Sequence, residues 1–195
     1  MRKVLFIFFS ISLFTSLACG LAVQGQTSSP MPPPAASASG GLGFSIAAIK
    51  KALQINNLLA FTNSTTGEPG YLGQPLITSA TLSGQSITKM KIQAALASGF
   101  SATFYGSPAN ISAIEMAMPY SKAYVIEDGE LLSAIPQIIL GANSVKADQI
   151  TAYHDWLTSV FSPNLAGSQT TTIGAITYAL IVDGNTLTLV MVPAQ

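Results

Sequence analysis

The clearest alternation of apolar and polar positions lies near the C-terminus. Two alternating runs, residues 176–182 and 186–192, are separated by Asp183-Gly184-Asn185. A glycine beside Asp or Asn between two such runs predicts a β-hairpin. With the turn at Asp183-Gly184, one face of the hairpin is wholly apolar and the other is mixed, and a turn at Gly184-Asn185 keeps the same faces. This pattern is typical of an antiparallel sheet packed on one side.

Other segments extend the predicted sheet. Residues 76–82, 87–96 and 100–105 each show strand-like alternation. Residues 111–118 fit a strand and a helix equally well. Residues 62–73 are rich in Asn, Ser, Thr and Gly and predict a loop.

A second hairpin is predicted over residues 124–132, where Asp128-Gly129 lies between apolar runs. Glu127 and Glu130 would then face each other at its solvated tip. These residues form the only acidic cluster, and two carboxylates are the minimum for glycoside hydrolysis. Because the spacing also lacks the ligand pattern of a calcium-binding EF-hand loop, we interpret the cluster as a turn.

Two segments have helical spacing. The first covers residues 45–59, with Ile46, Ile49 and Leu53 on one side. The second covers residues 146–161 and is followed by a proline, as expected of a helix end. Together the segments predict an α+β fold, a mainly antiparallel meander sheet with two helices.

The first part of the chain has a different pattern. Two basic residues precede a largely apolar stretch of 15 residues, which is short for a bilayer span and typical of a signal peptide. The Pro, Ser, Ala and Gly that follow predict a flexible linker. We therefore expect a signal peptide over residues 1–19, a linker over residues 20–41 and a single α+β domain over residues 42–195.

The signal peptide ends in a Leu-Ala-Cys-Gly sequence around Cys19, the only cysteine in the chain. This sequence resembles the lipobox of bacterial lipoproteins, although Ser16 stands where the family usually has Leu. The resemblance implies acylation of Cys19, and two or more acyl chains hold a protein stably on a membrane. The alternative is plain secretion, with cleavage after one of the small residues that follow Cys19.

The composition excludes several classes of function. Only 8% of the residues are charged, with 8 Lys+Arg and 8 Asp+Glu, and 49% are hydrophobic. Such a chain has no basic patch for nucleic acid. One His and one Cys cannot supply a standard zinc site or an intrachain disulfide. No glycine-rich phosphate loop with its following Lys is present, so we expect neither a metal nor a cofactor.

His154 lies beside Asp155, a pair that invites a catalytic interpretation. Adjacent side chains on a helix point about 100° apart, so Asp155 cannot orient His154 as a catalytic triad requires. We interpret His154 as a half-buried packing residue on the apolar face of its helix. Asn63 and Asn110 begin N-glycosylation sequons, which apply only to a eukaryotic source.

Together these features predict an exported binding or assembly module without catalytic activity, located on the cell envelope or outside the cell. Its partner would be an envelope or extracellular protein, or a second copy of the chain. An alternative is an exported carrier of a lipid or other apolar ligand, since Met and aromatic residues could line a pocket. A third interpretation is a secreted hydrolase that works through Asp and Glu.

Overall fold

The computed structural model describes residues 40–62, 73–121, 125–162 and 164–195. These residues form one seven-stranded antiparallel sheet and five helices. The signal peptide, Cys19, nearly all of the linker and Asn63 lie outside the described residues, as does most of the predicted loop over residues 62–73. Within the described residues, no helix is both long and apolar enough to cross a bilayer.

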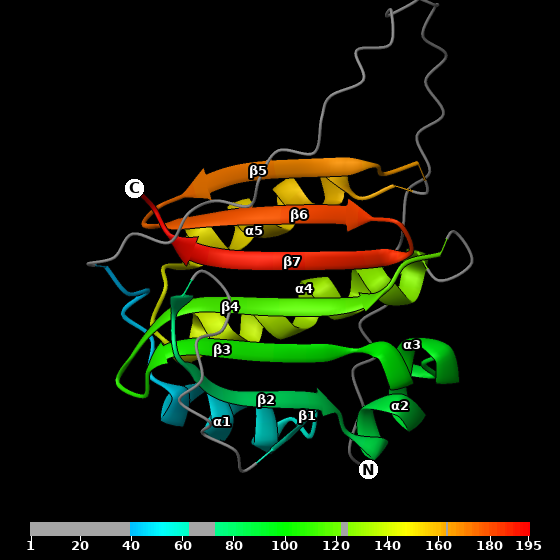
Figure 1. Ribbon diagram of the computed structural model, residues 1–195, viewed down its shortest axis with the longest axis horizontal. Helices are drawn as coiled ribbons and strands as arrows, with labels where there is room; N and C mark the ends of the chain where they lie inside the picture. The colour runs from blue at the N-terminus through cyan, green and yellow to red at the C-terminus, as the bar shows by residue number, and fades with distance from the viewer. Residues whose placement is uncertain (1–39, 63–72, 122–124, 163) are drawn as a thin grey trace, which may run out of the picture.

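The elements follow one another from an N-terminal helix to a C-terminal strand (Figure 1). They are α1 (Ile46–Ile55), β1 (Leu59–Phe61), β2 (Leu76–Leu82), α2 (Gly84–Met90), α3 (Ala94–Gly99), β3 (Ser101–Ser107), β4 (Asn110–Pro119), α4 (Val125–Ala142), α5 (Ala147–Val160), β5 (Gly167–Ile173), β6 (Ile176–Asp183) and β7 (Thr186–Pro193).

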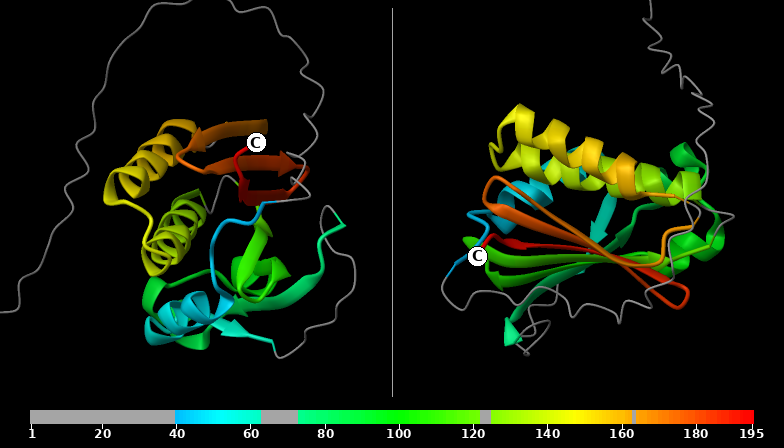
Figure 2. Two further views of the ribbon diagram at one scale, coloured as in Figure 1. Left: turned by 90° about the vertical axis from the view of Figure 1, so that its left-hand side faces the viewer. Right: turned by 90° about the horizontal axis from the view of Figure 1, so that it is seen from above.

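The strand order across the sheet is β1-β2-β3-β4-β7-β6-β5. The first four strands form a meander. After β4 the chain passes through α4 and α5 to the far edge, and β5, β6 and β7 then return to the centre, where β7 pairs with β4. Helices α1, α4 and α5 all lie on one face of the sheet (Figure 2). The α+β antiparallel prediction is confirmed, but the described residues contain five helices rather than two.

The C-terminal hairpin confirms the predicted faces. Leu180 pairs with Leu189, which places the turn at Gly184-Asn185 rather than at Asp183-Gly184. Gly184 has a φ of +58°, and a type II′ turn places its glycine at the first central position. The change of register by an even number of residues leaves every side chain on its predicted face.

The main core lies between the helices and the face of the sheet that they cover. Helix α1 buries Ile46, Ile49 and Leu53 against it, as its apolar spacing predicts. Ser45 stands at the N-cap, but its side chain makes no capping bond, and its N–H donates to Asn143 Oδ1 at 3.1 Å. Large side chains that are fully buried here include Leu53, Leu96, Phe104, Met116, Leu131, Tyr153 and Tyr178.

Residues 87–96 are not a strand, because they cover the end of helix α2, a three-residue connection and the start of helix α3. Ser83 Oγ accepts a hydrogen bond from the N–H of Ser86 at 3.2 Å and so caps α2. Lys91 ends α2 in the left-handed conformation, with a φ of +52°. The alternation of apolar and polar residues in this segment therefore does not mark a strand. The N-cap at Ser83 and the left-handed Lys91 define α2, and α3 follows after a short connection.

The second predicted hairpin is also wrong, since residues 125–132 begin helix α4. Glu127 and Asp128 lie in its first turn, where the helix dipole favours negative charge on a partly exposed side chain such as Glu127. Gly129 lies within the helix, and a Cβ added to it would meet Phe161 Cε1 at 3.1 Å. The glycine therefore permits close packing of α5's C-terminal end on α4, rather than a turn.

The remaining predictions have mixed outcomes. Helix α5 matches the predicted second helix, with Lys146 at its N-cap. Residues 111–118 belong to strand β4. The first helix ends at Ile55, four residues before the predicted limit, because the chain turns into β1. Strand β5 was not predicted, since its sequence has little apolar alternation.

Helix α4 continues through Pro136, which has no N–H to donate to the carbonyl of Leu132. The hydroxyl of Tyr153 on α5 donates to this carbonyl instead, at an oxygen–oxygen distance of 2.5 Å. Tyr153 is fully buried, and its ring centroid lies 4.8 Å from that of Tyr178 on β6. The Tyr153 side chain thus supplies the hydrogen bond that Pro136 cannot give to the Leu132 carbonyl. It also connects α4, α5 and the sheet.

Candidate functional site

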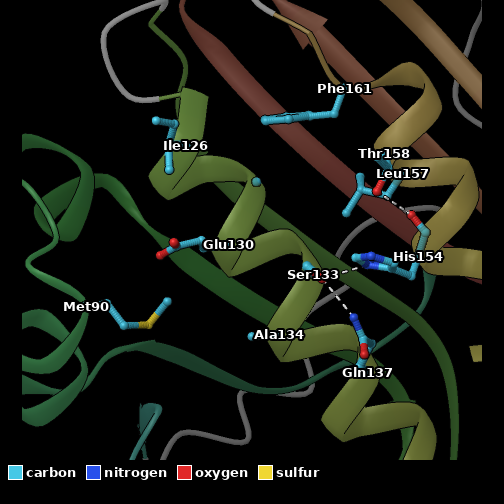
Figure 3. A pocket seen from close by; sticks show the side chains of 11 residues that line it. Met90, Ile126, Glu130, Ser133, Ala134, Gln137, His154, Leu157, Thr158 and Phe161 are labelled. Atoms are coloured by element: carbon cyan, nitrogen blue, oxygen red, sulfur yellow. Dashed lines mark hydrogen bonds between the residues drawn. The ribbon is translucent and has the colours of Figure 1, made fainter. Parts of the chain in front are cut away.

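A groove with a volume of about 740 Å³ opens between α2, α4 and α5. This volume lies within the range of small-molecule binding sites. Figure 3 shows side chains from all three helices around it. It is lined by Met90, Ile126, Gly129, Glu130, Ser133, Ala134, Gln137, His154, Leu157, Thr158 and Phe161.

One part of the groove is apolar. Met90 of α2, Ile126 of α4 and Phe161 at the end of α5 contribute to it, and Leu157 forms part of its floor. Ile126 is 75% exposed, and Ile55 is the other large apolar side chain among the described residues with such high exposure. Exposed apolar surface beside a concavity is typical of a binding site.

The other part of the groove carries a hydrogen-bonded polar cluster. Ser133 Oγ lies 3.1 Å from His154 Nδ1, and Gln137 Nε2 donates to the same Oγ at 2.8 Å. Figure 3 shows both bonds: the one to His154 joins α4 to α5, and the one from Gln137 lies within α4. The bond between Oγ and Nδ1 can run in either direction, since a hydroxyl both donates and accepts and the donor depends on the tautomer of His154.

The structure corrects the interpretation of His154. Its side chain is exposed at the groove and is not half-buried in the core. The predicted separation from Asp155 holds, since Asp155 is also exposed and makes no described hydrogen bond to the imidazole. Among the described residues, the hydrogen-bond partner of the His154 ring is therefore Ser133.

The Ser133–His154 pair lacks two features of a hydrolase. Ser133 lies in the interior of α4, where the backbone N–H groups are used by the helix and cannot form an oxyanion hole. No described carboxylate is hydrogen-bonded to His154 to orient it. The hydroxyl, amide and imidazole of the cluster are groups that can exchange hydrogen bonds with a ligand in the groove.

The charge of the groove is low. Within the described lining, Glu130 is the only charged residue, and it points toward the side of Met90, away from His154 (Figure 3). No Lys or Arg lines the groove among the residues that the structure describes. An anionic ligand would meet no compensating charge from these described residues, so they favour a neutral or cationic molecule.

The predicted acidic cluster is divided by the helix. Glu130 faces the groove and Glu127 is partly exposed, whereas Asp128 is fully buried and its carboxyl oxygens have no hydrogen-bond partner among the described residues. Burial, and to a smaller extent the charge of Glu127, raise the pKa of Asp128 to about 7. The cluster is thus not a solvated turn.

Other carboxylates do not join this site. Glu115 alternates with the core residues of β4 and so lies on the face of the sheet opposite the helices. Its neighbour is the hydroxyl of Tyr105, 3.4 Å away, and burial raises its pKa. No described group of three His, Cys, Asp or Glu residues could hold a metal ion.

Sequence reasoning missed Ser133, Gln137 and the groove itself. The i, i+4 spacing of Ser133 and Gln137 is a helical signal, but the Asp-Gly pair upstream suggested a hairpin. Met90 was placed in a strand rather than at the end of α2. Asn110, the described sequon residue, is exposed at the start of β4, where its Oδ1 accepts from the N–H of Gly43 at 2.9 Å.

Comparison with protein-family models, with curated proteins and with solved structures finds no match to this chain. Its function has to be inferred from the chemistry of the groove, because a fold by itself does not specify a function.

Proposed function

We propose that this protein is an exported, non-catalytic binding module whose ligand lies in the groove between α2, α4 and α5. The observation that carries the proposal is the combination of apolar walls with one polar cluster, Ser133, Gln137 and His154. A few placed polar groups in an apolar concavity fix the orientation of a ligand and give specificity. The ligand would have an apolar body and a neutral or cationic hydrogen-bonding group.

The groove can be tested with a neutral apolar dye, N-phenyl-1-naphthylamine, whose fluorescence rises in apolar surroundings. We expect Ile126→Ser to weaken dye binding roughly 5- to 10-fold, because the exposed isoleucine contributes apolar contact at the mouth of the groove. Ile55→Ser is the matched control, since Ile55 is 70% exposed on α1 and does not line the groove. Equal loss of binding in the two variants, or none in either, would count against the site.

A second candidate function, carriage of a wholly apolar ligand, is supported by Met90, Leu157 and Phe161 in the lining. The two candidates differ in their need for the Ser133 hydroxyl. Competition of the dye by decan-1-ol and by decane separates them in Ser133→Ala. We expect the variant to bind decan-1-ol about 3- to 10-fold more weakly than the original chain and decane unchanged. Unchanged binding of both would favour the apolar carrier.

Export and anchoring belong to the same proposal. Support comes from the signal-like N-terminus and from the lipobox resemblance at Cys19. A lipid anchor followed by the linker over residues 20–41 would hold the groove at a distance from the membrane surface. The intact mass of the mature chain tests this directly. A chain that begins at Cys19 and carries two or three acyl groups supports the anchor, whereas an unmodified mass indicates plain secretion.

A further inference from the structure

The two edges of the sheet are built differently. Strand β1 has only three residues, and Lys50 Nζ lies over the ring of its Phe61, 5.3 Å from the centroid. Short strands and nearby lysines are the usual protection of a sheet edge against pairing with another chain. Strand β5, at the opposite edge, has seven residues, Gly-Ser-Gln-Thr-Thr-Thr-Ile, with no charge and no proline.

Strand β5 also lacks a bulge. Its pairing with β6 runs without a shift from Gly167↔Val182 to Ile173↔Ile176. The two strands are joined by a two-residue turn, in which Gly174 has a φ of +60°. The residues that flank such a turn, Ile173 and Ile176, form a hydrogen-bonded pair, and hydrogen-bonded pairs then recur at every second residue. The N–H and C=O groups of the intervening residues, Ser168, Thr170 and Thr172, therefore point away from β6. Figure 1 shows this strand at the rim of the sheet.

We propose that β5 is an interaction surface, and that its partner is β5 of a second copy of this chain, paired antiparallel about Thr170. In this register Thr170 meets Thr170 of the other copy, and Ser168 meets Thr172. These are the residues whose backbone groups point outward, so about six hydrogen bonds can form between the copies. The two sheets would join into one continuous sheet with both helical layers on the same side.

The chemistry of the strand favours a second copy as its occupant. Pairing of identical strands places like residues opposite each other, and like charges in such positions repel. Strand β5 has none, and its outward positions are hydroxyl-bearing residues that pair favourably across strands. Exposed side chains at Gln169, Thr170 and Thr172 leave the edge accessible. A partner of strong charge would find no complement on this strand.

The expected dimer is weak. A single added strand pair buries less surface than the roughly 1,600 Å² of a standard stable interface. We therefore expect a dissociation constant in the micromolar range rather than an obligate dimer. Such a dimer suits a module held at high local concentration on a surface, where a second contact is effectively intramolecular.

Sedimentation of the exported chain tests the proposal. The original chain is expected to shift from monomer to dimer between about 1 and 100 μM. Thr170→Pro removes an outward N–H that β6 does not use, and Thr170→Lys places like charges opposite each other, so both should remain monomeric. Thr186→Lys, on the exposed tip of the last hairpin, is the matched control and should dimerise normally. Circular dichroism of each variant verifies the fold.

The register is tested by a disulfide. In a Cys19→Ser background, Thr170→Cys places two thiols opposite each other across the dimer axis, at a Cα separation of about 5.5 Å that a disulfide can bridge. We expect rapid oxidation to a covalent dimer, and none for Thr186→Cys in the same background. A monomeric original chain at 100 μM, dimerisation of Thr170→Pro equal to the original, or equal crosslinking at both cysteine positions would overturn the proposal.

Discussion

Replacement of Asp128 by Asn is expected to stabilise the protein at pH 8 by roughly 2 to 4 kcal/mol, and by less than about 1 kcal/mol at pH 4. Asp128 is fully buried in the first turn of α4, and its carboxyl has no hydrogen-bond partner among the described residues. Burial and Glu127 raise its pKa from 3.8 to about 7. The asparagine has the shape of the protonated acid without its titration.

The direction follows from the raised pKa. An acid with a higher pKa in the folded state than in the unfolded state binds a proton more tightly when folded. The free energy of unfolding is therefore greatest when Asp128 is protonated, and falls as the pH rises from about 4 to about 7. Above about pH 7 Asp128 is ionised in the folded chain, and the loss of folding free energy from its buried charge reaches its full value. Its upper limit is about 4 kcal/mol, since each pKa unit corresponds to about 1.4 kcal/mol.

Urea unfolding at pH 4, 6 and 8 measures the effect. Asp155→Asn is the matched control, because Asp155 is an exposed carboxylate on α5 and its replacement should change the stability by less than about 0.5 kcal/mol at each pH. The interpretation fails if Asp128→Asn alters the stability equally at pH 4 and pH 8. That result would mean that the carboxyl of Asp128 has the same pKa in the folded and unfolded chains.

The second large effect is expected from Tyr153→Phe, which should destabilise the protein by about 1 to 3 kcal/mol. The change removes only the hydroxyl that donates to Leu132 O. Since Pro136 has no N–H, this carbonyl loses its hydrogen-bond donor and stays buried. The free-energy cost of removing the Leu132 carbonyl from water is then not offset by a hydrogen bond.

A double-mutant cycle isolates this bond. Pro136→Ala restores an N–H four residues after Leu132, so Tyr153→Phe should cost at least about 1 kcal/mol less in that background. Tyr178→Phe serves as the control for a buried tyrosine of the same stack, because no described hydrogen bond holds its hydroxyl. Additive effects of Tyr153→Phe and Pro136→Ala would show that the hydroxyl does not replace the missing helical bond.

The groove could not be predicted from the sequence because it depends on which elements lie side by side. Ser133 and His154 are 21 positions apart, and their contact exists only because α4 and α5 pack as neighbours. The Asp128-Gly129 pair concealed α4, since the same two residues are a turn signal in a local window. In the folded chain Phe161 packs against Gly129, which favours a helix over a turn at these residues. Because Phe161 is distant in sequence, a local window does not contain this contact.

The sequence by itself determined the features whose cause is local. The apolar faces of α1, α5 and the last hairpin follow from periodicity, because a side chain's face is set by its position along a helix or strand. The low charge and the single cysteine and histidine are likewise properties of the chain alone. From them we predict neither a basic nucleic-acid surface nor a standard zinc site, without reference to any fold.

Only the tertiary structure decided the rest. The conflicting local signals of residues 87–96 and 124–132 were resolved by capping and by close packing. The burial of Asp128, the pairing of Tyr153 with an interrupted helix and the exposure of the β5 edge all depend on long-range neighbours. The physical reason is shared, since solvation and hydrogen-bond satisfaction depend on the residues that surround a group and not on those that adjoin it in sequence.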